Sequence, residues 1–402
     1  MTKEQFAEAL KCALRAHRER CPRVQAEDIV KFAFQGFLGM GHLLSDPALV
    51  EKRIAEEMRQ EQAAREEALT EDVSPAWCRL NLRRAKAEGL TPRTLSKMMF
   101  LSGDSAGFTR EDVIRFCRTL SEEEKQPELL AEALLLRDVH RLPSHSGAYR
   151  RAYHPAYRVV SASWRPLLPA VCAILEKQAE DARTLVTVDG PCASGKTTLA
   201  RRLAEILDCG VVHTDDFVVP HRQKTPDRLA VPGGNCDWER LTREVIGPWK
   251  SGSQVRVRKY DWNADCLKPP EQIRPGRLLI LEGSYCNLPP IRKYADLRLF
   301  VKIPDEIRFE RLKRRESPES LERFRERWIP LEDAYFEHYG LPDRGCLILA
   351  DTAAGDGKAF EKPQACLLGH GLSQTPVLID PKDKPDPAKD LQIDAFCDAL
   401  EK

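Results

Sequence analysis

The chain has 402 residues, of which 42 % are hydrophobic and 31 % are charged, and its formal net charge is +1. This composition is typical of a globular protein of two or three domains, and a net charge near zero gives no overall field that would attract nucleic acid. No apolar run approaches the roughly 20 residues that cross a bilayer. The 13 cysteines are odd in number and never spaced as C-x-x-C. We therefore expect a cytoplasmic protein with reduced thiols and no membrane or nucleic-acid partner.

Residues 1–183 are predicted to form a mostly α-helical domain. Capping boxes and polar residues before a proline mark helix starts, and they occur at Thr2 with Gln5, Asp46, Thr91, and Ser121 with Glu124. Strand-like alternation is nearly absent in this half. A last helix, over about 163–182, is expected to lead into the next domain.

From residue 184 the pattern changes to short apolar runs that alternate with helical segments. The runs are 184–189, 210–214, 277–282, 297–302 and 346–350. Buried parallel strands have this character, so we predict an α/β domain over 184–352, with a five-stranded parallel sheet and flanking helices. Residues 353–402 are expected to be a C-terminal extension that is partly linker-like, with a short helix over the last dozen residues.

The stretch "GPCASGKT", residues 190–197, matches the phosphate-binding loop pattern G-x-x-x-x-G-K-[ST]. Small residues let the backbone N–H groups point at phosphate oxygens, and the helix that follows adds the positive end of its dipole. Lys196 would reach the β- and γ-phosphates, and the Thr197 hydroxyl would ligate Mg²⁺. The predicted ATP-binding residues are Gly190, Ala193, Ser194, Gly195, Lys196, Thr197 and Thr198.

Two acidic residues, Asp215 and Asp216, follow the second predicted strand. The carboxyl ends of strands in an open α/β sheet surround its ligand crevice. A carboxylate there can accept the proton of an attacking hydroxyl, which is the catalytic role in phosphoryl transfer. The other interpretation is an acidic pair that caps the next turn.

The chain resembles the uridine kinase-like family of P-loop small-molecule kinases, which includes phosphoribulokinase and bacterial-type pantothenate kinase. The resemblance covers about residues 184–350 and rests on five elements in order: the loop Gly190–Thr197, Asp215 with Phe217, Asn235 with Asp237, Tyr260 with Asp261, and Glu282 with Gly283. It implies a kinase that uses ATP and Mg²⁺.

The resemblance also implies a role for several individual residues. Asp215 matches the catalytic base, and Asp237 matches the carboxylate that holds ribose hydroxyls in nucleoside-specific members. Tyr260 matches an aromatic residue beside the acceptor's base. The predicted metal-binding residues are Thr197, Glu282 and Asp215, and the predicted acceptor-binding residues are Asp237, Trp238, Tyr260 and Arg222. Trp238 could stack on a planar acceptor, but a tryptophan of this kind more often belongs to the core.

The sequence departs from the family pattern at two places. The lid segment "RFERLKRR" keeps Arg311, Arg314 and Arg315, and we predict Arg314 and Arg315 as catalytic. The family's second arginine cluster does not align clearly, which leaves Arg323, Arg325 and Arg327 as alternatives. Asp237 also lacks the family's following His-Pro, which leaves the acceptor open.

These observations predict an ATP- and Mg²⁺-dependent phosphotransferase that acts on a hydroxyl of a small molecule, with a nucleoside as the first acceptor. Pantothenate-like or sugar-phosphate acceptors are the alternatives, and an ATP-binding regulatory module is the alternative of another class. A homo-oligomer is compatible with the sequence. The segment 140–160, rich in histidine, tyrosine and arginine, is interpreted as an anion-binding surface, as a polar loop, or as a metal site together with His42.

Overall fold

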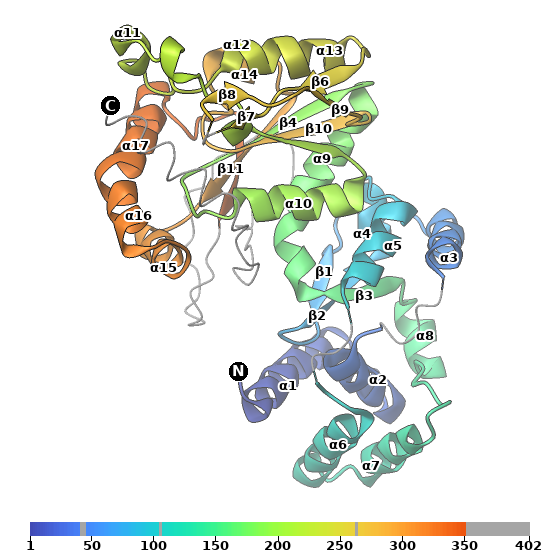
Figure 1. Ribbon diagram of the computed structural model, residues 1–402. Helices are drawn as coiled ribbons and strands as arrows, with labels where there is room; N and C mark the ends of the chain where they lie inside the picture. Colours follow the sequence, from blue (N-terminus) through green and yellow to red (C-terminus); the bar gives the residue numbers. More distant parts are fainter. Residues whose placement is uncertain (41–45, 104–106, 262–263, 351–402) are drawn as a thin grey trace. The chain divides into compact units, whose positions relative to one another are not determined.

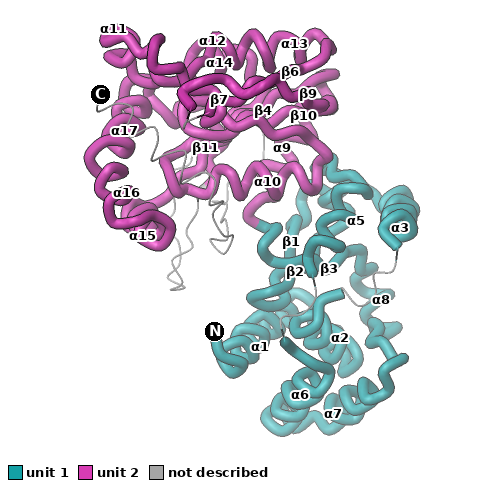
Figure 2. The backbone as a smooth tube through the Cα atoms, in the orientation of Figure 1, with its two compact units in different colours: residues 1–165 teal, residues 166–402 magenta. Residues whose placement is uncertain are grey.

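A computed structural model describes residues 1–40, 46–103, 107–261 and 264–350 (Figure 1). The chain divides into two compact units, Met1–Arg165 and Pro166–Lys402 (Figure 2). The division precedes the helix that we expected to close the first domain, so this helix belongs to the second unit. The helix expected at the C-terminus, the linker-like segment and His42 lie outside the described residues.

The first unit is mostly helical, as the sequence predicts. Its helices are α1 (Lys3–Arg20), α2 (Ala26–Leu38), α3 (Pro47–Gln60), α4 (Leu82–Ala87), α5 (Pro92–Leu101), α6 (Arg110–Glu124), α7 (Pro127–Leu134) and α8 (Gly147–Tyr153). Apolar side chains from α1, α2, α6 and α7 form its core. The unit also contains a three-stranded antiparallel sheet that the sequence analysis missed, in the order β1 (Thr70–Asp72), β2 (Trp77–Asn81) and β3 (Tyr157–Ser161).

Three of the four expected helix starts are confirmed. Thr2 caps α1 in a complete capping box, and Asp46 and Thr91 cap α3 and α5 ahead of a proline. The expected start at Ser121 is wrong, because Ser121 lies in the last turn of α6 and its hydroxyl donates to the Gln126 carbonyl at 2.7 Å. A serine with a glutamate three residues later therefore occurs here near the end of a helix.

The second unit is an α/β domain around a five-stranded parallel sheet, which confirms the predicted fold class. The strands are β4 (Thr184–Asp189), β5 (Gly210–His213), β10 (Leu278–Glu282), β11 (Leu297–Lys302) and β12 (Cys346–Ala350), in the order β12-β11-β4-β10-β5. The central strands β4 and β10 are buried along their whole length. This burial explains why they read as continuous apolar runs.

Helices and two short hairpins complete the second unit. The helices are α9 (Leu168–Glu180), α10 (Lys196–Leu207), α11 (Pro226–Leu229), α12 (Trp238–Leu241), α13 (Gly247–Lys250), α14 (Pro289–Arg292), α15 (Asp305–Arg315), α16 (Pro318–Arg323) and α17 (Ile329–Tyr339). The hairpins pair β6 (Val255–Val257) with β9 (Glu271–Ile273), and β7 (Tyr260–Asp261) with β8 (Cys266–Leu267). No helix in the described ranges combines the length and the apolar character that crossing a membrane requires.

The register of the sheet aligns the carboxyl ends of three strands. Glu282 at the end of β10 is opposite Val188 of β4 on one side and His213 of β5 on the other. The loops that leave these three strands therefore start side by side. In parallel α/β sheets this edge holds the ligand.

Candidate active site

The loop between β4 and α10 has the backbone conformation of a phosphate-binding loop. Gly190 has φ = +142°, and a Cβ at this position would lie 2.4 Å from the Val301 carbonyl oxygen, so only glycine fits. Gly195 has φ = +94° and precedes the first residue of α10 without a capping side chain. Because the N-cap residue supplies no side-chain acceptor, the start of α10 is suited to bind an anion.

Two polar side chains of this loop are suited to bind phosphate. One now pairs with loop carbonyls that a phosphate would replace, and the other lacks, in the described part of the chain, a partner that a phosphate would supply. The Lys196 ammonium donates to the carbonyls of Gly190 at 2.8 Å and Pro191 at 2.9 Å, and the residue is only 8 % exposed. The Ser194 hydroxyl is fully buried and has no hydrogen-bond partner among the described residues. Buried polar groups are nearly always paired, so the loop is suited to an acceptor that supplies the missing bonds.

A buried carboxylate lies against the loop. Glu282 is 1 % exposed and accepts hydrogen bonds from the Thr197 hydroxyl at 3.1 and 3.2 Å and from His213 Nδ1. A P-loop hydroxyl beside a carboxylate is the set of hard oxygen ligands that Mg²⁺ uses together with phosphate oxygens. Protein side chains alone provide no cluster of three or more metal-ligating His, Cys, Asp or Glu residues anywhere in the described ranges.

Asp215 lies beside Gly283, the residue that follows Glu282. A Cβ on Gly283 would be 2.2 Å from the Thr214 hydroxyl oxygen and 3.3 Å from Asp215 Oδ1, and Gly283 has φ = +128°. Asp215 is exposed at the surface of the domain. The structure therefore brings the predicted residues Lys196, Thr197, Glu282 and Asp215 to the same edge of the sheet.

The last residue of β4, Asp189, is a buried acid that the sequence analysis did not single out. Its carboxylate accepts hydrogen bonds from Gly190 N–H at 2.8 Å, Asn287 N–H at 3.1 Å and the Tyr335 hydroxyl at 2.8 Å. Burial outweighs these bonds and raises the pKa of Asp189 to about 6. Because the folded state favours the protonated form, the stabilisation present below about pH 4 is lost as the pH rises through 6, on the order of 3 kcal/mol.

A second missed carboxylate holds the loop in place. Glu332 of α17 accepts from Cys192 N–H at 2.8 Å, from the Ser284 hydroxyl at 2.5 Å and from Arg308 of α15 at 2.7 Å. Glu332 and Arg308 are both buried. These bonds connect the phosphate-binding loop, the loop after β10, α15 and α17. The residues are far apart in sequence, so no local motif could have identified the cluster.

The arginines of α15 do not all face the loop. Arg311 donates to the carbonyl of Ala193 at 3.1 Å, and Arg308 reaches Cys192 Sγ at 3.3 Å. Of the two predicted as catalytic, Arg314 is exposed and Arg315 hydrogen-bonds Glu316 at 2.5 Å. Positions three and seven residues after Arg308 share its helix face, and this periodicity could have pointed to Arg311.

Each of the predicted acceptor-binding residues has its own neighbours. Asp237 is buried, caps α12, and pairs with Arg240 at 2.8 Å. Tyr260 is buried and donates to Asp265 at 2.6 Å. Trp238 is half-buried and packs against the main core of this unit, and Arg222 is exposed. Their roles remain predictions.

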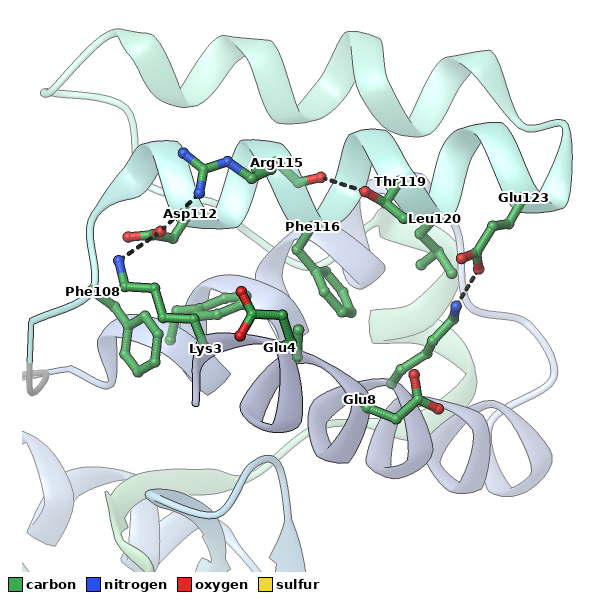
Figure 3. A pocket seen from close by; sticks show the side chains of 13 residues that line it. Lys3, Glu4, Glu8, Phe108, Asp112, Arg115, Phe116, Thr119, Leu120 and Glu123 are labelled. Carbon is green, nitrogen blue, oxygen red and sulfur yellow. Dashed lines mark hydrogen bonds and ion pairs between the residues drawn. The ribbon is translucent and has the colours of Figure 1, made fainter. Parts of the chain in front are cut away.

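A cavity of about 300 Å³ lies between α1 and α6 of the first unit (Figure 3). Its floor is aromatic, with Phe37, Phe108 and Phe116. Lysines at its rim pair with carboxylates across it, Lys3 with Asp112 and Lys11 with Glu123 (Figure 3). Because these charges are already paired, we assign this cavity no charged ligand.

Comparison with known proteins agrees with the P-loop assignment. Residues 186–329 match the family model described as an AAA domain. A phosphoribulokinase of Synechocystis sp. is 26 % identical over 134 residues, which make up 32 % of this chain and 40 % of that protein. The chain therefore spans less than half the length of this relative. The match confirms the resemblance to the P-loop kinase family that the sequence motifs indicate.

Solved structures that match part of the chain include a possible uridine kinase from Bacillus stearothermophilus, with 20 % identity and a TM-score of 0.32 over 42 % of this chain and 92 % of that chain. Another is the YGR205w protein, with 14 % identity and a TM-score of 0.33 over 47 % of this chain and 91 % of that one.

Proposed function

We propose that the second unit is a phosphotransferase that moves the γ-phosphoryl group of ATP to a hydroxyl of a small molecule. The proposal rests on one observation: the carboxyl ends of β4, β10 and β5 lie side by side at one edge of the sheet. The phosphate-binding loop follows β4, Glu282 ends β10, and Asp215 follows β5. A nucleotide switch needs the first two groups, but an exposed carboxylate beside them suits a second substrate.

In this reaction Lys196 exchanges its two loop carbonyls for phosphate oxygens, and the N–H groups at the start of α10 bind the same phosphates. Asp215 orients the acceptor hydroxyl and takes its proton as the new P–O bond forms and ADP leaves. Arg311, already in contact with the loop, supplies positive charge for the transferring group.

Thr197 and Glu282 would hold Mg²⁺, with Asp215 nearby. The metal, when bound, neutralises the charge of the phosphates. His213 hydrogen-bonds Glu282 and helps to fix the orientation of this carboxylate.

A nucleoside remains the first acceptor that we propose, and the similarity to a phosphoribulokinase favours a sugar phosphate as the second. The nucleoside interpretation depends on Asp237, whose carboxylate is paired with Arg240. For Asp237 to hold ribose hydroxyls, its contact with Arg240 must rearrange or be shared.

The test is ADP release from ATP and Mg²⁺ across nucleosides, pantothenate and pentose phosphates. We expect one acceptor to stimulate release, and Lys196→Ala to abolish the signal. Asp215→Asn should lower the rate by on the order of 10²- to 10⁴-fold while ATP still binds. If Asp215→Asn leaves the acceptor-dependent rate unchanged, the proposed base is wrong. If no acceptor stimulates release although ATP binds, an ATP-binding regulatory module becomes the better account.

A further inference from the structure

Asp215 lies in the middle of a short turn whose first residue is held by a neighbouring loop. The turn Thr214–Asp216 (the Asp215 turn) is a single 3₁₀ turn that follows β5, and the Phe217 N–H closes it by donating to the Thr214 carbonyl at 2.8 Å. The buried Thr214 hydroxyl donates to the Ser284 carbonyl at 2.9 Å. The first residue of the turn is therefore fixed to the loop that follows β10.

Arg240 of α12 holds the other end of the turn. Its Nη2 donates to the carbonyl of Asp216 at 3.1 Å and to that of Val218 at 3.4 Å. Its Nη1 donates to the carbonyl of Arg258, two residues before β7. A guanidinium presents its N–H groups in one rigid plane, which lets a single side chain bond several backbone segments at once. Arg240 thus joins the Asp215 turn to the segment that leads into β7.

The Arg240 guanidinium is buried, and its counter-ion lies beside it. Arg240 is 1 % exposed, and its Nε donates to one oxygen of the Asp237 carboxylate at 2.8 Å. The other oxygen of Asp237 accepts from the Arg240 backbone N–H at 3.1 Å, as the N-cap of α12. The Arg240 Cζ atom lies 4.5 Å from the centroid of the Phe217 ring. A buried polar group with so many bonds is held in one arrangement.

The helical segment that carries Arg240 is anchored in the core of the second unit. Leu241, Val245 and Ile246, on α12 and its continuation, are fully buried there. Backbone bonds also tie the start of α12 to the chain after the turn, since the Asp237 N–H donates to the Phe217 carbonyl at 2.7 Å. Because the core fixes this segment, the Arg240 side chain fixes the carbonyl that it binds, one residue after Asp215.

We propose that Arg240 is a positioning residue of the phosphotransferase, which holds the Asp215 turn so that the carboxylate meets the acceptor hydroxyl. This inference rests on the proposed function, because it requires Asp215 to be the base. Thr214 fixes one end of the turn and Arg240 the other, so Asp215 has a defined place although it is exposed. Proton transfer depends on such placement, and a displacement of about 1 Å can cost on the order of 10²-fold in rate.

The test compares Arg240→Gln with Arg243→Gln in the full chain, with the acceptor that stimulates ADP release. Arg243 is exposed on the same helical segment, three residues after Arg240, and is the matched control. We expect Arg240→Gln to lower the kcat of acceptor-dependent release by on the order of 10²-fold. The KM for ATP and the acceptor-independent release should stay within about two-fold, because the phosphate-binding loop is unchanged. Arg243→Gln should alter none of these quantities.

A double variant separates positioning from a general loss of structure. If Arg240 acts through Asp215, Arg240→Gln should lower the residual rate of Asp215→Asn by no more than about two-fold, because the base is already absent. A general structural defect would lower that residual rate as strongly as it lowers the wild-type rate. Multiplicative losses, or an unchanged kcat in Arg240→Gln, would overturn the proposal.

Hydrogen exchange tests the same contact without reference to activity. The Phe217 amide should exchange faster in Arg240→Gln than in Arg243→Gln, by on the order of ten-fold, because the turn that it closes is released. Equal exchange in the two variants would overturn the proposal. If Arg240→Gln alone does not fold because Asp237 has lost its partner, the paired variant Asp237→Asn/Arg240→Gln, which removes both charges, replaces it in every comparison.

The outcomes also separate this inference from the proposed function. A normal kcat in Arg240→Gln beside an inactive Asp215→Asn removes only the role of Arg240. If no acceptor stimulates release by the wild-type chain, or if Asp215→Asn is fully active, the proposed function fails and the role of Arg240 fails with it.

Discussion

The buried pair between Glu332 and Arg308 leads to a sharp prediction about the phosphate-binding loop. Glu332→Ala removes the acceptor of Cys192 N–H, the Ser284 hydroxyl and Arg308. The Arg308 side chain is 3 % exposed, so the guanidinium would remain buried without its main partner. Removing one partner of a buried pair costs about 3–5 kcal/mol.

The contacts of Arg308 place the expected cost at the lower end of this range. Arg308 also lies 3.7 Å from Asp305 and 3.5 Å from Asp333, whose side chains are 77 % and 60 % exposed and retain some compensation. We therefore expect Glu332→Ala to lower the free energy of unfolding by about 3 kcal/mol. For a unit of this size that corresponds to a fall in Tm of roughly 6–12 °C.

Urea and thermal unfolding of the full chain measure this cost. The signal to monitor is the unfolding transition of the second unit. Asp333→Ala is the matched control, because it removes an exposed acid next in sequence that also approaches Arg308; we expect a loss below about 1 kcal/mol. The double variant Arg308→Met/Glu332→Ala should be less destabilised than the sum of the singles, by on the order of 2 kcal/mol. Equal losses for Glu332→Ala and Asp333→Ala, with additive singles, would refute the reasoning.

Other predictions concern the same edge of the sheet. Gly283→Ala places a Cβ against the Thr214 hydroxyl at a positive φ and should lower the free energy of unfolding by about 2–4 kcal/mol. Gly276→Ala, where φ is +75° and no atom lies closer than 3.8 Å to the new Cβ, should lower it by about 1 kcal/mol in the same urea titration. Tyr335→Phe removes a hydrogen bond that lowers the pKa of Asp189, so the pKa rises further and the loss grows with pH. We expect a loss of about 2 kcal/mol at pH 8 and about 1 kcal/mol at pH 5; Tyr339→Phe should show no such difference, and an equal loss for Tyr335→Phe at both pH values would contradict the assignment.

Local patterns predicted much of the second unit. All five strands of the sheet lie where the apolar runs indicated, because strands buried on both faces require continuous apolar residues. The phosphate-binding loop was equally clear, since glycines at fixed spacing are required by its backbone angles. Strands β1 to β3 were missed for a different reason: β1 has only three residues, and β2 pairs with β3, which follows it by more than 70 residues, so no local run of sequence marks the sheet.

The sequence by itself therefore determined the class of this protein: a parallel α/β domain with a nucleotide-binding loop, preceded by a helical unit. Only the tertiary structure decided which side chains act together. Asp215 lies beside Gly283, which follows Glu282, because β10 pairs with β5. Arg311 rather than Arg314 meets the phosphate-binding loop because of the rotation of α15. In the first unit, polar contacts likewise connect five separate parts of the chain: α2, the segment before α8, β3, β2 and β1. Local periodicity encodes which face of an element is buried, whereas the partner across that face depends on packing between distant segments.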